Sequence, residues 1–108
     1  MSRFTEVIGR LQTVVAGRVG ADAASSYTAK LLAGGPPLAA KKFGEEAVET
    51  ALASVQNDPG AVAAESADML YHWLVLLTAC GVSLDEVAAR LEAREGRSGL
   101  DEKASRGA

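Results

Sequence analysis

The sequence has little of what several classes of protein require. It contains one cysteine, Cys80, so no disulfide can form within the chain, and we expect a reducing compartment. Because Cys80 lies in an apolar segment, we interpret it as a core residue. The 3 prolines stand with glycine in short breaks between long stretches rich in Ala, Leu, Val, Glu and Lys. This composition is typical of a helical protein.

A basic surface and a long apolar run are also missing. The formal net charge is −3, whereas a nucleic-acid-binding face normally needs an excess of Lys and Arg. The most apolar stretch, residues 69–82, is too short to span a bilayer. The first residues carry charges and lack the continuous apolar core of a signal peptide. We therefore predict a cytoplasmic protein with no nucleic-acid partner and no membrane association.

Hydrophobic periodicity predicts an all-α fold. The chain is 48% hydrophobic, which is ample for one core, and we expect a single domain over residues 1–94. The polar, glycine-rich residues 95–108 are predicted to be disordered. The expected fold is a bundle of four to five helices. Helices are expected over residues 4–15, 37–56 and 59–81. A short helix is expected to end at residue 32, and a further one to begin after residue 83.

Capping residues support these boundaries. Ser25 or Ser26 can cap the second helix, and Asp58 can cap the fourth, with proline in its first turn. Ser83 and Glu86 have the spacing of a capping box at the start of the fifth helix.

Acidic residues form stripes on the third and fourth predicted helices. Glu45, Glu46 and Glu49 share one side of the third helix, and Glu65 and Asp68 lie one turn apart on the fourth. Like-charged neighbours of this kind destabilise a helix by about 0.2–0.5 kcal/mol each. A surface selected only for solubility would intersperse the two signs.

Ordinary ion pairing is the alternative interpretation of these stripes. Lys41 stands four residues before Glu45, and Lys42 four residues before Glu46, but lysine on the N-terminal side is the weaker orientation.

The fourth predicted helix favours a metal site over ion pairing. Its apolar residues face nearly every direction, as in a buried helix, yet Glu65, Asp68 and His72 form a stripe on it. Buried carboxylates need a cation. Hard oxygen ligands without thiolates suit Mg²⁺ or Mn²⁺, and the Glu-x-x-His pairs of a di-iron bundle are absent. For His72, a hydrogen bond to Asp68 or to the backbone competes with contact to a substrate.

The same helix predicts self-association. A chain of 108 residues has few other helices with which to cover an apolar circumference, and the exposed remainder marks an interface. We expect an obligate homodimer that completes the core. Trp73, Leu76 and Leu77 are interface candidates, with core packing within one chain as the alternative.

Several segments resemble a known family. Residues 45–49 (Glu-Glu-Ala-Val-Glu) and 65–68 (Glu-Ser-Ala-Asp) are similar to the magnesium motif Glu-Glu-x-x-Glu and Glu-x-x-Asp of all-α nucleoside triphosphate pyrophosphohydrolases. Residues 26–32, 41–47 and 68–72 narrow the resemblance to phosphoribosyl-ATP pyrophosphatases, from about residue 4 to 93. Ser66 and Met69 depart from the expected Ala and Leu, and neither change removes a ligand.

The resemblance implies hydrolysis of phosphoribosyl-ATP to phosphoribosyl-AMP and pyrophosphate, the second step of histidine biosynthesis, in a homodimer. It also implies roles for individual residues. The implied metal ligands are Glu46, Glu49, Glu65 and Asp68. Glu45 is a further ligand or the base that orients the attacking water. The expected contacts to phosphate or ribose are Ser26, Tyr27, Thr28, Lys30, Lys42 and His72, whereas Lys41 is expected to be solvated.

Simpler roles stay open for two of these residues, because Ser26 can instead cap a helix and Tyr27 can belong to the core. Two other functions also stay open. One is a house-cleaning nucleotide pyrophosphohydrolase with the same acidic motif, which residues 26–30 disfavour. The other is a non-catalytic helical dimerisation module.

Overall fold

The computed structural model describes residues 2–95, and within this range the chain forms helices and loops but no strand. The predicted all-α class is therefore confirmed. The predicted tail, from residue 96 onward, lies outside the described residues, and the domain boundary at 94 stays a prediction. The helices are α1 (Arg3–Ala16), α2 (Tyr27–Ala33), α3 (Gly35–Val55), α4 (Pro59–Cys80) and α5 (Leu84–Glu92).

Side-chain caps start three of these helices as predicted. Ser26, not Ser25, caps α2, and its Oγ accepts a hydrogen bond from the backbone N–H of Ala29 at 3.2 Å. Asp58 caps α4 through the N–H of Ala61 at 3.1 Å. Ser83 and Glu86 form both hydrogen bonds of the predicted capping box, so local sequence determines where α5 begins.

Helix α3 begins earlier than predicted, at Gly35 instead of Pro37. The first N–H groups of a helix have no partner within it, so both prolines fit in the first turn. Gly35 has a φ of 72°, which suits glycine best. A β-carbon at Gly34 would lie 2.4 Å from the side chain of Leu38, so these two glycines permit the sharp corner between α2 and α3.

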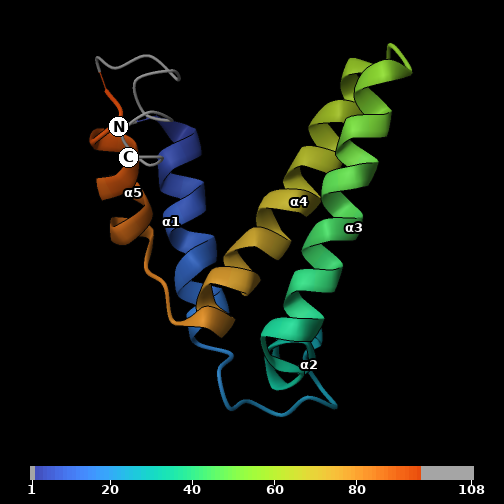
Figure 1. The fold of residues 1–108 in the computed structure, drawn as a ribbon. Helices are drawn as coiled ribbons and strands as arrows, with labels where there is room; N and C mark the ends of the chain where they lie inside the picture. The colour runs from blue at the N-terminus through green and yellow to red at the C-terminus, as the bar shows by residue number, and fades with distance from the viewer. Residues whose placement is uncertain (1, 96–108) are drawn as a thin grey trace, which may run out of the picture.

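Helices α3 and α4 form a long antiparallel hairpin (Figure 1). The short turn between them includes Asn57, at a φ of 58° that asparagine tolerates better than most residues. Figure 1 shows α1 meeting the hairpin near the end of α4 and diverging from it, with α5 beside α1.

The main core lies where α1, α2 and the hairpin meet. It consists of the buried residues Val15, Leu31, Ala39 and Val75, one from each of α1 to α4. A hydrogen bond between the hydroxyls of Thr28 and Tyr71 also ties α2 to α4. The junction therefore fixes α2 against the hairpin.

Two interpretations of individual residues were wrong. Cys80, the last residue of α4, is exposed, although the preceding residue, Ala79, packs against the junction core. Tyr27, for which a core role was open, is 55% exposed at the start of α2. No helix in the described part of the chain has both the length and the apolarity needed to cross a membrane.

Candidate functional site

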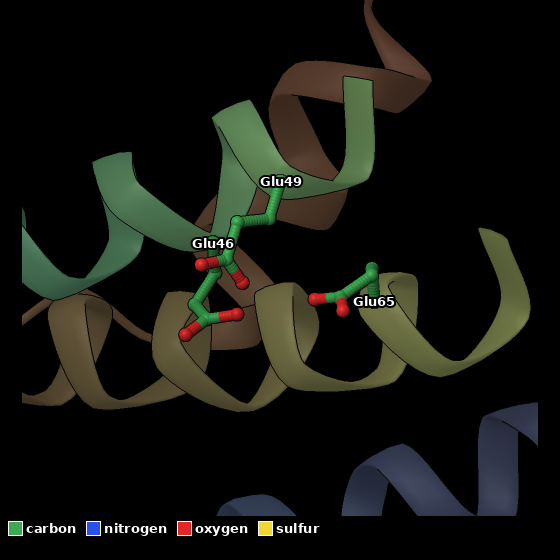
Figure 2. A group of neighbouring side chains, drawn as sticks. All are labelled: Glu46, Glu49 and Glu65. Carbon is green, nitrogen blue, oxygen red and sulfur yellow. The ribbon is translucent and has the colours of Figure 1, made fainter. Parts of the chain in front are cut away.

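Three carboxylates meet between α3 and α4. Glu46 and Glu49 of α3 and Glu65 of α4 each offer one carboxylate oxygen, and these oxygens lie within 4.8 Å of one another. Figure 2 shows the side chains pointing toward the space between the two helices. We call Glu46, Glu49 and Glu65 the carboxylate cluster. Oxygens this close can share one cation.

The hairpin creates the carboxylate cluster from simple spacing. Glu46 and Glu49 lie three residues apart, so they share one face of α3. The antiparallel return of α4 brings Glu65 opposite that face. Three of the four metal ligands expected from the sequence are thus neighbours.

The electrostatics of the carboxylate cluster favour a positive ligand. Burial raises the pKa of Glu46 above its ordinary value, and Glu49 and Asp68 raise it further while His72 opposes them. Burial likewise raises the pKa of Glu65, with Glu49 as the next cause. One buried carboxylate oxygen of Glu46 and one of Glu65 have no hydrogen-bond partner among residues 2–95. Such oxygens are costly to ionise without a partner.

The other predicted acidic residues lie outside the cluster. Asp68 is exposed, in contrast to the burial expected for its stripe, but it is close enough to raise the pKa of both Glu46 and Glu65. Glu45 is also exposed and pairs with Lys42, with 3.8 Å between Oε2 and Nζ. Both residues keep their predicted roles as hypotheses.

Three of the predicted substrate-binding residues gather at the α2 end of the site. His72 is buried, and the exposed Tyr27 stands edge-on to it, with ring centroids 6.4 Å apart. Thr28 is bound to Tyr71, the neighbour of His72. Lys30 and Lys41 are exposed, and nothing in the geometry assigns them a ligand.

The sequence analysis missed a groove of about 220 Å³ beside the carboxylate cluster. Glu49 and Glu65 line it together with Leu52 of α3 and Gln56, the residue that caps the C-terminus of α3, and Ala53 and Ala61 complete it. Leu52 and Gln56 follow Glu49 by three and seven residues, so helical spacing alone could have placed them on the same face.

Comparison with known proteins identifies the family of the chain. Residues 8–95 match the profile of the family described as phosphoribosyl-ATP pyrophosphohydrolase, which is most of the chain. The chain belongs to the phosphoribosyl-ATP pyrophosphohydrolase family. The resemblance stated from the sequence motifs is therefore confirmed, and the whole carboxylate cluster lies within the matched residues.

Individual relatives cover nearly the whole chain. The phosphoribosyl-ATP pyrophosphatase of Caulobacter vibrioides is 62% identical over 104 residues, which are 96% of each chain. The protein of that name from Parvibaculum lavamentivorans is 62% identical over 107 residues, covering 99% of this chain and 98% of its own. The one from Methylobacterium radiotolerans is 58% identical over 106 residues, covering 98% and 97%.

Proposed function

We propose that the chain hydrolyses phosphoribosyl-ATP to phosphoribosyl-AMP and pyrophosphate at the carboxylate cluster, with Mg²⁺ or Mn²⁺ as cofactor. This reaction is the second step of histidine biosynthesis. The family and the names of the relatives support the substrate. The observation that carries the site is the approach of three carboxylate oxygens to within 4.8 Å.

The residues of the cluster fit a divalent cation. All three donors are hard oxygens, as Mg²⁺ and Mn²⁺ prefer. The unpartnered oxygens of Glu46 and Glu65 would gain a ligand, and the cation would relieve the repulsion among the three carboxylates. Glu46, Glu49 and Glu65 would hold the ion, and Asp68 would reach it directly or through a water.

The chain's own residues would divide the remaining work. A bound Mg²⁺ would neutralise charge on the phosphate oxygens and acidify a water. Glu45 would act as a further ligand or orient the attacking water. Lys30 and Lys42 would contact the phosphates. In the free chain Lys42 forms an ion pair with Glu45. Water attack at the α-phosphorus breaks the bond to the β-phosphate and releases pyrophosphate.

A substrate panel tests this proposal. The purified chain with Mg²⁺ is expected to release pyrophosphate from phosphoribosyl-ATP faster than from ATP, dATP or other common nucleoside triphosphates, and to lose this activity in excess chelator. A preference for the common triphosphates would favour the house-cleaning alternative. The absence of pyrophosphate release from every member would favour the non-catalytic module.

A second copy of the chain is the partner that its exposed apolar surface favours. Phe43, Met69, Leu70 and Trp73 line an apolar pocket of about 250 Å³ on the hairpin. Val48, Leu52 and Val55 add a largely exposed stripe along α3. A soluble monomer rarely exposes so much apolar surface.

We therefore keep the homodimer as part of the proposal, with Trp73 as its best supported interface residue. Leu76 packs against the junction core, and nothing tests Leu77. A cytoplasmic location also stays a prediction. Sedimentation equilibrium at low micromolar concentration is the test of assembly, and a folded, active species of single-chain mass would contradict it.

A further inference from the structure

One ring nitrogen of His72 has a hydrogen-bond partner, and the other has none among the described residues. His72 is 8% exposed. Its Nδ1 lies 2.9 Å from the backbone carbonyl oxygen of Asp68, one turn earlier on α4. Its Nε2 is buried and has no hydrogen-bond partner among the described residues. A buried polar atom without a partner is uncommon in a folded protein.

The chemistry of the carbonyl fixes the role of each nitrogen. A carbonyl oxygen only accepts hydrogen bonds, so Nδ1 carries a proton and donates it. In the neutral ring the other nitrogen, Nε2, is then a bare acceptor. The backbone of α4 therefore holds the ring in one tautomer and leaves one lone pair free.

The surroundings hold the ring in place beside the carboxylate cluster. Tyr71 stands edge-on to it, with ring centroids 4.9 Å apart, and Tyr27 of α2 faces it from another side. The hydrogen bond between the hydroxyls of Tyr71 and Thr28 fixes this arrangement across two helices. His72 follows Glu65 by seven residues, or two turns of α4, so the ring lies on the same side of this helix as the cluster.

We propose that Nε2 of His72 accepts a hydrogen bond from an O–H group when the site is filled. The two sources of that chemistry are a ribose hydroxyl of the nucleotide and a water bound to the metal ion. A phosphate oxygen carries no proton to donate at neutral pH and is a poor partner for this tautomer. The inference rests on the proposed function, since it takes the nucleotide and the ion from there.

Nuclear magnetic resonance reads this contact directly, because His72 is the only histidine in the chain. In protein labelled with [¹⁵N]histidine, the neutral ring is expected to carry its proton on Nδ1 and to have a bare Nε2. Addition of Mg²⁺, and then of a phosphoribosyl-ATP analogue with methylene between the α- and β-phosphates, gives the two arms. A shift of the bare nitrogen with Mg²⁺ alone indicates the metal-bound water.

A shift of the bare nitrogen only with the analogue indicates the ribose hydroxyl. A neutral ring with its proton on Nε2 instead of Nδ1, or a bare nitrogen unchanged in both arms, would overturn the inference.

Two substitutions supply an independent test, because glutamine and asparagine imitate different nitrogens of the ring. His72→Asn keeps a donor near the position of Nδ1, and His72→Gln keeps a polar group near the position of Nε2. We expect kcat/KM to fall about 10- to 100-fold in His72→Asn and less in His72→Gln, as for loss of a hydrogen bond to a buried group. The reverse order would mean that only the bond to Asp68 matters, and would overturn the proposal.

These measurements separate failure of this inference from failure of the proposed function. If the unaltered chain releases no pyrophosphate from phosphoribosyl-ATP, the function fails whatever His72 does. If it turns over normally while the bare nitrogen stays unperturbed in both arms, the contact to His72 alone is wrong.

Discussion

The α3–α4 hairpin and the outer helices α1 and α5 differ in how much of their apolar surface a single copy of the chain buries. The two helices of the hairpin pack together along their length and bring the carboxylate cluster together. By contrast, α1 buries only Val15 and α5 buries no residue, although both helices are amphipathic. Phe4 and Leu91, on these two outer helices, are more than half exposed.

This difference teaches that the carboxylate cluster depends on the hairpin alone, whereas association also involves the outer helices, in addition to the apolar pocket of the hairpin around Trp73. The carboxylate cluster needs one hairpin, so substitutions in it should affect chemistry before stability. The outer helices have apolar faces without a partner in one copy, so substitutions there should affect association first. The following predictions test this division, from the largest expected effect to the smallest.

The largest effect is expected from Glu49→Gln in the hairpin. The change removes one charged oxygen donor of the cluster and should lower kcat/KM more than about 100-fold, because loss of residues that merely support metal ligands already costs 10- to 100-fold. The thermal midpoint without metal should not fall, since a like charge beside Glu46 and Glu65 is removed. Pyrophosphate release and thermal melts measure the two quantities.

Glu92→Gln is the matched control for this substitution. It makes the same change of charge on exposed α5, outside the cluster. Near-normal turnover by Glu49→Gln, or an equal loss in Glu92→Gln, would break the assignment of the chemistry to the hairpin.

The same division explains which features could be predicted from the sequence. Asp58 and the Ser83–Glu86 capping box act over three residues, so the sequence contains all that is needed to place these helix starts. The acidic stripes were predictable because helical spacing and one short turn bring Glu46 and Glu65 together. Both features follow from rules that relate residues close together in the sequence.

Features that depend on packing between distant segments could not be predicted. The hydrogen bond between Thr28 and Tyr71 joins residues 43 positions apart in the sequence, and no short sequence pattern predicts this pair. The exposure of Cys80 depends on the side of α4 that the other helices leave uncovered, which its apolar neighbours do not reveal. The exposure of Asp68 likewise depends on which side of α4 the other helices cover.

The second prediction concerns α1. Val14 is 49% exposed on this helix, so a dimer that covers the apolar face of α1 would bury the carboxylate of Val14→Asp. We expect the dissociation constant of the dimer to rise at least about 10-fold, equivalent to 1.4 kcal/mol. Val19→Asp, at a position 63% exposed in the loop after α1, is the control and should change little. Equal sedimentation behaviour of both variants and the unaltered chain would show that α1 is not at the interface.

The third prediction compares two helix caps. Asp58→Ala removes the cap of α4 and should lower the global free energy of unfolding by about 1 kcal/mol, measured in urea. Ser83→Ala removes a similar cap from α5, but its cost should appear mainly as faster amide exchange within α5, because that helix packs weakly on the rest. A larger global loss from Ser83→Ala than from Asp58→Ala would reverse the proposed ranking of the two regions.

The smallest expected effect is on the pH dependence of the free energy of unfolding, measured in chelator. The sign of the difference between Glu46→Gln and the unaltered chain is the quantity to test. The pKa of Glu46 is raised in the folded chain, so ionisation of this carboxylate lowers the free energy of unfolding. As pH falls through the raised pKa toward 4.5, the folded chain takes up the proton first and the cost is relieved. Glu46→Gln lacks this cost and should be the more stable protein near neutral pH, with the difference narrowing on acidification.

Saturating Mg²⁺ should reverse the order, because only the intact cluster gains the full binding energy of the ion. Urea titrations of both proteins at several pH values, with and without Mg²⁺, measure this, and a difference that widens on acidification would contradict the role of Glu46 in the cluster.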